Sequence, residues 1–362
     1  MGGMRVAYTL EQCWHDVPGG TAVAALEVAR RLAPRPDVTL VGVAGRHRHP
    51  PAPPWRAPIP IAQLSLGRVL LYEAWLRLRR PRVESVTGPI DVAHATGIVP
   101  CATAAPLVVT FADVAFLHEP DHFSRQGLRV LRRSLDVTRD VAQLVLTPSE
   151  ASRRELQDAG IDGRRIRVVP WGVDVSPATH EAIATVRRHY QLPERFVLYV
   201  GTLEPRKNLR RLADAAGRAT DPLPLVVVGP DGWGDAVRDV TGDVRFLGFV
   251  PGDDLAALYA AASVFAYPSE REGFGLPVVE AMAQGTPVVT SAGTATEEAA
   301  GGAAVLVDPL DVDAIAAGLD TAHDQSAVLA KAGLARAGAL TWEAAADATL
   351  AAYREALGVD RA

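Results

Sequence analysis

The fold of this chain is decided by the stretch Pro268-Ser-Glu-Arg-Glu-Gly-Phe-Gly-Leu-Pro-Val-Val-Glu-Ala-Met-Ala-Gln-Gly-Thr-Pro-Val-Val-Thr-Ser291. An apolar strand is expected to end near Pro268, and a glycine-containing turn follows it. Pro277 suits the first position of a helix, and Gly285 suits the end of one. The turn therefore lies at the carboxyl end of a strand, which is where ligands bind in open α/β sheets.

The same turn carries groups that can hold a charged, hydroxylated ligand. Glu272 precedes the predicted helix and Glu280 lies inside it, so the two carboxylates can face one ligand at different depths. Taken alone, Glu280 is explained more simply by a solvated helix face. Backbone N–H groups at a helix N-terminus favour an anion. Here they belong to Gly273, Phe274, Gly275 and Leu276.

Strands and helical patterns alternate on both sides of this stretch. In the second half, strands are predicted at 196–200, 225–228, 244–246, 264–267, 288–291 and 305–307, with helices at 209–219, 255–261 and 276–284. In the first half, strands are predicted at 5–8, 38–43, 91–94, 107–110 and 144–148, with helices at 21–32, 66–78 and 126–140. Alternation of this kind predicts parallel sheets covered by helices, twice over.

The length of 362 residues also favours two domains, because a single hydrophobic core stops growing below that size. Turn-forming residues cluster in Pro170-Trp-Gly-Val-Asp and the following Ser-Pro-Ala-Thr, which places the hinge near Gly172 to Pro177. The predicted domains are residues 1–173 and 174–341. An Ala-rich helix with no strand behind it is expected from Thr341 onward.

A second motif lies upstream, in Leu198-Tyr-Val-Gly-Thr-Leu-Glu-Pro-Arg-Lys-Asn-Leu209. Gly201 lets the backbone turn tightly after a strand. Arg206 and Lys207 then place two cations where charge-assisted hydrogen bonds can hold a diphosphate. For these two residues alone, a helix start decorated with surface cations is the simpler interpretation.

Together these motifs resemble the retaining glycosyltransferases of family 4, the glycosyl transferases group 1. Members share a pair of glutamates ahead of a Gly-x-Pro-Val-Val strand, which are Glu272 and Glu280 here. The resemblance implies that Glu280 binds the donor ribose, and that Glu272 with the amides of Gly273, Phe274 and Gly275 addresses the hexose and its phosphate. It also implies that Arg206 and Lys207 bind the diphosphate in place of a metal ion.

The resemblance extends over most of the chain, through Asp91-Val-Ala-His-Ala-Thr, Leu146-Thr-Pro-Ser-Glu-Ala-Ser and Ile166-Arg-Val-Val-Pro-Trp-Gly-Val-Asp. It implies the GT-B architecture, in which two Rossmann-like domains with parallel sheets face each other across a deep interdomain cleft. Residues 1–173 are then the acceptor-binding domain and residues 174–341 the nucleotide-sugar domain. The terminal helix, residues 342–362, is expected to pack back on the first domain.

The acceptor side departs from the family pattern at one position. The family usually has His-Asp after the strand, whereas this chain has Ala112 followed by Asp113. His94 and His118 are candidates to replace the missing histidine, although a lone histidine is more often structural.

Gly19 and Gly20 open a helix after the first strand and either approach a ligand or serve a tight turn. Their pattern is not Gly-x-Gly-x-x-Gly, which argues against a dinucleotide cofactor.

Composition excludes several other classes of protein. Hydrophobic residues make up 48% and charged residues 22% of the chain, which is typical of globular proteins. The net charge of −5 and the lack of long basic runs argue against a nucleic-acid partner. Two cysteines cannot build a disulfide framework or a zinc site alone, so no metal site and a cytoplasmic location are expected.

Membrane contact is expected to be peripheral at most. No signal peptide or membrane-spanning stretch is predicted. The apolar, arginine-rich stretch from Leu66 to Arg80 either covers the first sheet, which is the favoured interpretation, or lies on the inner face of an anionic membrane.

The expected activity is transfer of a hexose, with mannose as the first guess, from a nucleoside diphosphate to an acceptor hydroxyl. The donor base is left open among GDP, UDP and dTDP, and the acceptor among a glycan, a lipid-linked saccharide and a small natural product. No cofactor is expected beyond the donor itself. Two alternatives remain: a sugar-nucleotide epimerase or phosphorylase of the same fold, and a non-catalytic sugar-nucleotide-binding protein.

Overall fold

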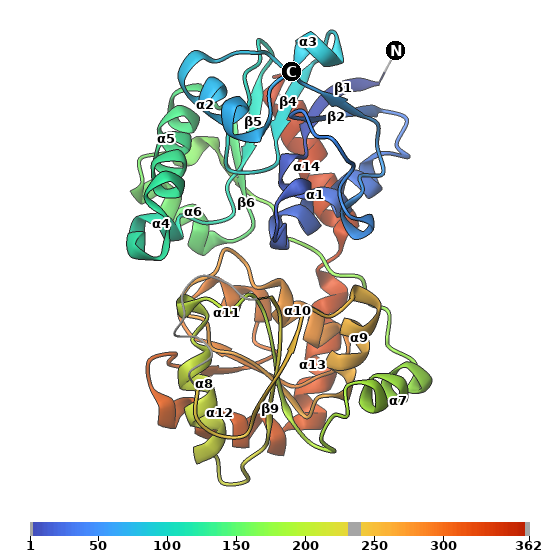
Figure 1. Cartoon of the computed structure of the whole chain (residues 1–362), viewed down its shortest axis with the longest axis vertical. Helices are drawn as coiled ribbons and strands as arrows, with labels where there is room; N and C mark the ends of the chain where they lie inside the picture. The colour runs from blue at the N-terminus through green and yellow to red at the C-terminus, as the bar shows by residue number, and fades with distance from the viewer. Residues whose placement is uncertain (1–2, 231–239, 359–362) are drawn as a thin grey trace. The chain divides into compact units, whose positions relative to one another are not determined.

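The computed structural model describes residues 3–230 and 240–358. The chain divides into two compact units, Met1–Gly172 with Trp342–Ala362, and Val173–Thr341 (Figure 1). Each unit is built on one parallel sheet, so the prediction of an α/β protein with two such sheets is confirmed.

The first unit has a seven-stranded sheet in the order β3-β2-β1-β4-β5-β6-β7, with all neighbouring strands parallel. Its strands are β1 (Met4–Thr9), β2 (Val38–Ala44), β3 (Ile61–Gln63), β4 (Val92–Ala95), β5 (Leu107–Thr110), β6 (Leu144–Thr147) and β7 (Ile166–Val168). The strand order reverses direction at β1, between β2 and β4. The edge strands β3 and β7 were not predicted. Each contains a polar residue, Gln63 or Arg167, whereas the equally short β13 is wholly apolar.

Helices cover both faces of this sheet. They are α1 (Gly19–Leu32), α2 (Arg68–Leu78), α3 (Glu84–Thr87), α4 (Ala115–His118), α5 (Arg125–Val141), α6 (Glu150–Asp158) and α14 (Trp342–Ala356). Right-handed connections put α1 on one face and α2 and α5 on the other (Figure 1). The last helix, α14, packs against α1 and contacts β5 and β6, so the first unit is made from both ends of the chain.

The second unit has a six-stranded sheet in the order β10-β9-β8-β11-β12-β13, again with all neighbours parallel. Its strands are β8 (Val197–Val200), β9 (Leu225–Val228), β10 (Val244–Gly248), β11 (Val264–Tyr267), β12 (Val288–Ser291) and β13 (Val305–Val307). Every residue of β8, β9, β11 and β12 is buried. Burial on both faces explains why these strands read as continuous apolar runs in the sequence.

The helices of the second unit are α7 (His180–His189), α8 (Leu209–Arg218), α9 (Gly252–Ala261), α10 (Leu276–Ala283), α11 (Ala295–Ala300), α12 (Val312–Asp324) and α13 (Ser326–Ala339). Short 3-10 turns lie at Glu11–Trp14, Pro53–Trp55, Pro120–His122 and Gly163–Arg165 in the first unit and at Pro205–Lys207 in the second. Helices α7 and α11–α13 were not predicted, since their apolar positions are mostly alanines, which mark a helical face weakly.

Candidate functional site

The sheet of the second unit reverses its strand order at β8. This strand pairs with β9 on one side and with β11 on the other. In open α/β sheets, ligands bind outside the carboxyl ends of the strands at such a switch point. Two segments leave the sheet here: the turn Pro205–Lys207 after β8, and the loop of residues 268–275 between β11 and α10.

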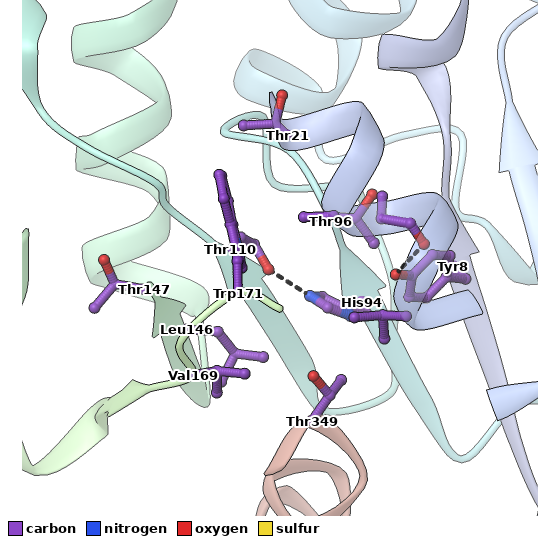
Figure 2. Close-up of a pocket in the computed structure, with 13 residues that line it drawn as sticks. Tyr8, Thr21, His94, Thr96, Thr110, Leu146, Thr147, Val169, Trp171 and Thr349 are labelled. Carbon is purple, nitrogen blue, oxygen red and sulfur yellow. Dashed lines mark hydrogen bonds between the residues drawn. The ribbon is translucent and has the colours of Figure 1, made fainter. Parts of the chain in front are cut away.

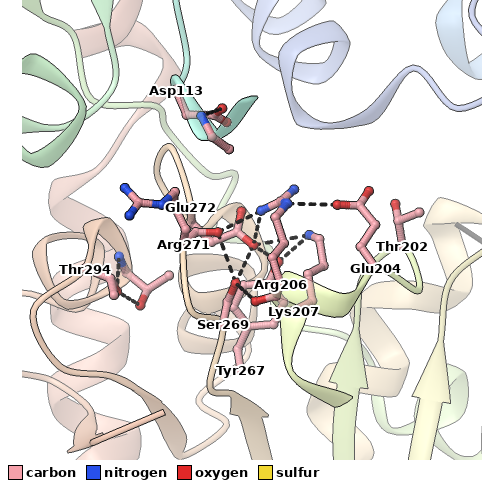
Figure 3. Close-up of polar contacts among 12 residues, drawn as sticks. Asp113, Thr202, Glu204, Arg206, Lys207, Tyr267, Ser269, Arg271, Glu272 and Thr294 are labelled. Atoms are coloured by element: carbon pink, nitrogen blue, oxygen red, sulfur yellow. Dashed lines mark hydrogen bonds and ion pairs between the residues drawn. The ribbon is translucent and has the colours of Figure 1, made fainter. Parts of the chain in front are cut away.

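Glu272 lies where these two segments meet. Its Oε1 atom accepts hydrogen bonds from the Tyr267 hydroxyl at 2.8 Å and the Ser269 hydroxyl at 2.9 Å. The same oxygen is 3.1 Å from Nη1 of Arg206 and 3.4 Å from Nζ of Lys207. Figure 3 shows these side chains pointing toward the carboxylate. We call Arg206, Lys207 and Glu272 the ion cluster.

The ion cluster fixes the charge of Glu272. Burial alone raises the pKa of this carboxyl group, but Lys207, Arg206 and the two hydroxyl donors outweigh burial and lower it to about 2. Glu272 is therefore an anion throughout the physiological range and serves as an acceptor of hydrogen bonds rather than as an acid.

Lys207 is a buried cation, with 9% of its surface exposed. Its Nζ donates to the Tyr267 hydroxyl at 2.6 Å and lies 5.2 Å from the centre of that ring. Gly201 makes room for it, because a Cβ atom at Gly201 would lie 3.3 Å from Cδ of Lys207 and 3.2 Å from the Tyr199 hydroxyl. The close approach is the reason for a glycine at this turn.

Arg206 ties the two loops together. Its Nε donates to Glu204 at 2.8 Å and its Nη1 donates to the Arg271 carbonyl at 2.7 Å. The Arg206 carbonyl accepts from the Glu270 N–H at 2.8 Å. The guanidinium is thus oriented before any ligand arrives, which lowers the ordering cost of binding.

Asn208 is a positioning residue that the sequence analysis missed. It has a left-handed conformation, with φ of 62°, and ends the turn before α8. Its Nδ2 donates to the carbonyls of Pro268 at 3.0 Å and Pro309 at 2.5 Å. Asparagine tolerates this backbone conformation better than most residues. The Lys-Asn pair directly before a helix could therefore have indicated the role of Asn208 from the sequence.

Tyr267 and Ser269 were also missed. Tyr267 is the last residue of β11, and Ser269 follows it two residues later. Their hydroxyl groups contribute to the site only because β11 lies beside β8. The order of strands along the chain does not show that these two strands are neighbours in the sheet.

The N-terminus of α10 lies next to the ion cluster in sequence. Gly275 precedes the helix with φ of 106°, a value that other residues rarely adopt. A Cβ atom there would also lie 2.9 Å from Cγ2 of Thr296. Gly273 and Phe274 come directly before it, so backbone N–H groups gather at the positive end of the helix.

Glu280 lies in α10, in a different environment. Its Oε2 accepts a hydrogen bond from the Tyr259 hydroxyl at 2.9 Å. Burial raises the pKa of Glu280, and the bond from Tyr259 opposes this only in part. The two glutamates therefore have different environments: Glu280 is bonded to Tyr259, whereas Glu272 belongs to the ion cluster.

In the first unit, His94 lines a pocket to which α1 and α14 also contribute, through residues that include Thr21 and Thr349 (Figure 2). Its Nδ1 pairs with the Tyr353 hydroxyl at 2.7 Å and its Nε2 with the Thr110 hydroxyl at 2.8 Å. Burial lowers the pKa of His94 to about 3, so the ring is neutral. With both nitrogens hydrogen-bonded, His94 has the environment of a structural histidine.

The remaining candidates of the first unit are spread out. Gly19 starts α1 with φ of 66°, and Gly20 follows it on the exposed side of the first turn. Asp113 accepts a hydrogen bond from the Ala115 N–H at 3.0 Å, at the start of the short helix α4. His118 ends α4, half-exposed, with Nε2 at 3.9 Å from Glu155.

In the part of the chain that the structure describes, no three histidine, cysteine, aspartate or glutamate side chains are grouped so that they could hold a metal ion. Over the same residues, no helix is long and apolar enough to cross a membrane.

Comparison with known families gives two matches that cover different parts of the chain. The model described as Glycosyltransferase Family 4 matches residues 18–177, and the model described as Glycosyl transferases group 1 matches residues 194–325.

Curated proteins also resemble this chain in sequence. The O-antigen chain mannosyltransferase B of Escherichia coli is 37% identical over 265 residues, covering 68% of this chain and 70% of the relative. The D-inositol 3-phosphate glycosyltransferases of Geodermatophilus obscurus and Mycobacterium tuberculosis are 35% and 32% identical over 61% of this chain. This chain spans only about half the length of those two, 54% and 50%.

Solved structures share the fold. HepE from Anabaena, crystallised with UDP and glucose, gives a TM-score of 0.71 at 20% identity, covering 99% of this chain and 100% of that one. WaaG, a glycosyltransferase involved in lipopolysaccharide biosynthesis, gives 0.72 at 19% identity, covering 96% and 98%. Sucrose-phosphate synthase from Thermosynechococcus elongatus gives 0.75 at 21% identity, covering 99% and 100%. The prediction of a GT-B fold is confirmed.

Proposed function

Because the chain belongs to glycosyltransferase family 4, we propose that it transfers a hexose from a nucleoside diphosphate sugar to an acceptor hydroxyl, with retained anomeric configuration. The nucleotide sugar is proposed to bind the second unit and the acceptor the first. The reaction proposed here needs no metal ion.

One observation carries this proposal: the ion cluster lies at the switch point of the second sheet. Two cations, Arg206 and Lys207, are held there by contacts of 2.6–3.4 Å before a ligand arrives. A diphosphate bound to them would gain charge-assisted hydrogen bonds, with further N–H donors from the start of α10. Such preorganised positive charge stabilises a departing diphosphate more than it stabilises the bound sugar.

The proposed chemistry follows from that charge. The bond between the anomeric carbon and the diphosphate oxygen breaks, and the acceptor oxygen bonds to the same face of that carbon. The acceptor proton passes to a diphosphate oxygen. Glu272 cannot supply a proton, since its pKa is about 2. Its Oε1 makes the contacts with Tyr267, Ser269, Arg206 and Lys207, and its Oε2 is proposed to accept a hexose hydroxyl.

Independence of a metal ion is proposed from the same two side chains. Arg206 and Lys207 supply two positive charges at the expected position of the diphosphate, which is the charge that a divalent cation would otherwise bring. Turnover that survives an excess of EDTA is the expected result. Loss of turnover that Mg²⁺ restores would contradict this part of the proposal.

Mannose is the proposed hexose, and GDP-mannose is the first donor to test, because the relative that matches over 70% of its own length is named a mannosyltransferase. UDP- and dTDP-sugars are the next donors, and HepE was crystallised with UDP. The acceptor is proposed to be a glycan, a glycolipid or a small natural product. Cys13 and Cys101 are free and buried, which agrees with the proposed location in the reducing cytoplasm.

The deciding experiment begins with thermal shifts of the full chain in GDP, UDP and dTDP. The base that stabilises the protein most identifies the donor series. That donor is then incubated with a panel of saccharide and lipid-linked acceptors, and the anomeric configuration of the product is determined by NMR. We expect release of the nucleoside diphosphate only when an acceptor is present. Release without any acceptor product, or an inverted product, would contradict the proposal.

A further inference from the structure

The carboxyl edge of the first sheet carries a carboxylate–histidine pair to which no role has been given so far. Glu11 opens the short turn after β1, and His47 follows the end of β2. These two strands are parallel neighbours, and the strand order of the sheet reverses at β1. The pair therefore stands where ligands bind in open α/β sheets.

Glu11 fixes the orientation and the tautomer of His47. Its Oε1 lies 2.9 Å from Nε2 of His47, and its Oε2 accepts the Gly45 N–H at 2.6 Å. Because a carboxylate oxygen can only accept, Nε2 of the ring carries the hydrogen, and Nδ1 of the neutral ring carries the lone pair. Trp14 stacks on the imidazole, with ring centres 4.3 Å apart and planes at 9°. Glu11 is 2% exposed, but 16% of the His47 side chain is exposed, so the oriented ring reaches the surface.

The imidazole of His47 is not needed to hold the loop that follows β2. The backbone of this loop is fixed by other groups: the Arg46 N–H donates to the Leu66 carbonyl at 2.8 Å, and the His47 N–H donates to Gln63 at 3.2 Å. The contact between ring and carboxylate is therefore additional to a loop that is already held. It leaves an oriented ring nitrogen that can meet a ligand.

A second imidazole belongs to the same group of residues. Burial, followed by the charge of Arg68, lowers the pKa of His15 to about 4, and the charge of His47 also acts on it. His15 is therefore neutral. Its Nε2 atom is buried and has no hydrogen-bond partner among the residues that the structure describes. Such a nitrogen costs free energy until a ligand or a water molecule satisfies it.

We infer that Glu11, Trp14, His15 and His47, here called the imidazole site, bind an uncharged sugar ring of the acceptor. A sugar hydroxyl both donates and accepts, so it can donate to Nδ1 of His47 and satisfy Nε2 of His15 in either tautomer. An anion has no hydrogen to donate to Nδ1, and the carboxylate of Glu11 would repel it.

A metal ion is not favoured at the imidazole site, because within residues 3–230 and 240–358 no three histidine, cysteine, aspartate or glutamate side chains are placed to hold one. The inference names the chemistry of the acceptor and so rests on the proposed function.

The test is saturation-transfer NMR of the full chain with three neutral probes: methyl α-mannoside, methyl α-glucoside and methyl β-galactoside. We expect the parent protein to bind at least one of them. His47→Gln keeps a donor for Glu11 but has no atom at the position of Nδ1, so binding of that probe is expected to weaken about fivefold. His15→Phe should weaken binding by a similar factor while the melting temperature stays the same or rises, because it removes an unsatisfied buried nitrogen. A purely structural role for His15 would not give that combination.

Two further variants serve as controls. His49→Gln should bind the probe like the parent, because His49 is exposed on the same loop and its contact with Trp14 uses the backbone carbonyl, at 2.8 Å. Lys207→Met should lose affinity for nucleoside diphosphates but also bind the probe like the parent. In transfer assays, His47→Gln and His15→Phe should raise the acceptor KM by the same factor as the loss of probe binding and leave kcat nearly unchanged.

Three results would overturn the inference. The first is that none of the probes binds the folded parent protein. The second is that His47→Gln and His15→Phe bind the probe as the parent does. The third is that inorganic phosphate displaces the probe, which would make this an anion site. Failure of the proposed function would give a different result: no nucleoside diphosphate would bind, while the probe would still bind and respond to both variants, which would support the sugar site alone.

Discussion

Replacement of Lys207 by methionine removes a buried cation from the second unit while keeping most of the side-chain volume. In the structure, Nζ donates to the Tyr267 hydroxyl at 2.6 Å and lies 3.4 Å from Oε1 of Glu272. The ammonium group is therefore already fixed in place. A ligand phosphate that meets it gains attraction without the usual cost of ordering a flexible lysine.

The size of the effect follows from that arrangement. A hydrogen bond to a charged group contributes about 1.5–3 kcal/mol. Lys207→Met should therefore weaken nucleoside diphosphate binding by roughly 10- to 150-fold. The pKa of Glu272 rises in this variant, because Lys207 is the strongest influence that lowers it. Arg206 remains, so Glu272 stays ionised at neutral pH and the loss of affinity belongs to Lys207.

Titration calorimetry with GDP, UDP and inorganic pyrophosphate measures this effect directly. Lys331→Met is the matched control, because Lys207 and Lys331 are the two lysines of the chain and Lys331 is exposed on α13. We expect the control to bind like the parent protein. Affinities of Lys207→Met within twofold of the parent, for all three ligands, would refute the assignment of the diphosphate to the ion cluster.

Three further predictions address neighbouring residues. Glu280→Gln should weaken binding of the preferred nucleoside diphosphate about tenfold or more but leave pyrophosphate affinity unchanged, because we propose that Glu280 contacts only the donor ribose. Equal losses for both ligands in calorimetry would contradict that proposed contact. Asn208→Ala should destabilise the second unit by about 2–3 kcal/mol, and Asn208→Gly should recover roughly 1 kcal/mol of that in urea unfolding, since glycine tolerates the left-handed backbone; an alanine variant as stable as the parent would contradict the positioning role. Glu272 has a folded pKa of about 2, below its ordinary 4.5, so its ionised form stabilises the fold above about pH 4.5 and this stability is lost as the pH falls toward 2. Pulsed hydrogen exchange in urea, followed in peptides from β8 and β11, should therefore give Glu272→Gln a free energy of unfolding about 3 kcal/mol lower than that of the parent at pH 7. This difference should shrink below about pH 4.5. A difference independent of pH would argue against the ion pairs.

The fold was largely predictable because its central strands are buried on both faces. Such strands read as unbroken apolar runs, and β9, β11 and β12 were predicted with the bounds that the structure has. The short edge strands β3 and β7 contain Gln63 and Arg167, which interrupt the apolar run, whereas the equally short β13 is wholly apolar and was predicted. Local sequence patterns also do not show on which side of β1 or β8 each further strand is added to the sheet.

The candidate site was predictable where a residue's role depends on its local backbone. Some turns can be predicted from their residue types alone. These include the turns that contain Gly201, Gly275 and the Arg206-Lys207 pair. Tyr267 and Ser269 act through a loop that comes from another strand, so their part in holding Glu272 depends on β8 and β11 being neighbours. In the first unit, the sequence alone also did not indicate that His94 would form a hydrogen bond with Tyr353.

That pairing of His94 with Tyr353 has a consequence for biosynthesis. Tyr353 belongs to α14, which is synthesised after the whole of Val173–Thr341. The first unit emerges first from the ribosome but lacks the helix that covers β5 and β6 until synthesis has passed the second unit. At about 5–20 residues per second, that delay is on the order of ten seconds or more. Throughout that interval the surfaces of α1, β5 and β6 that α14 contacts in the folded unit lack this cover.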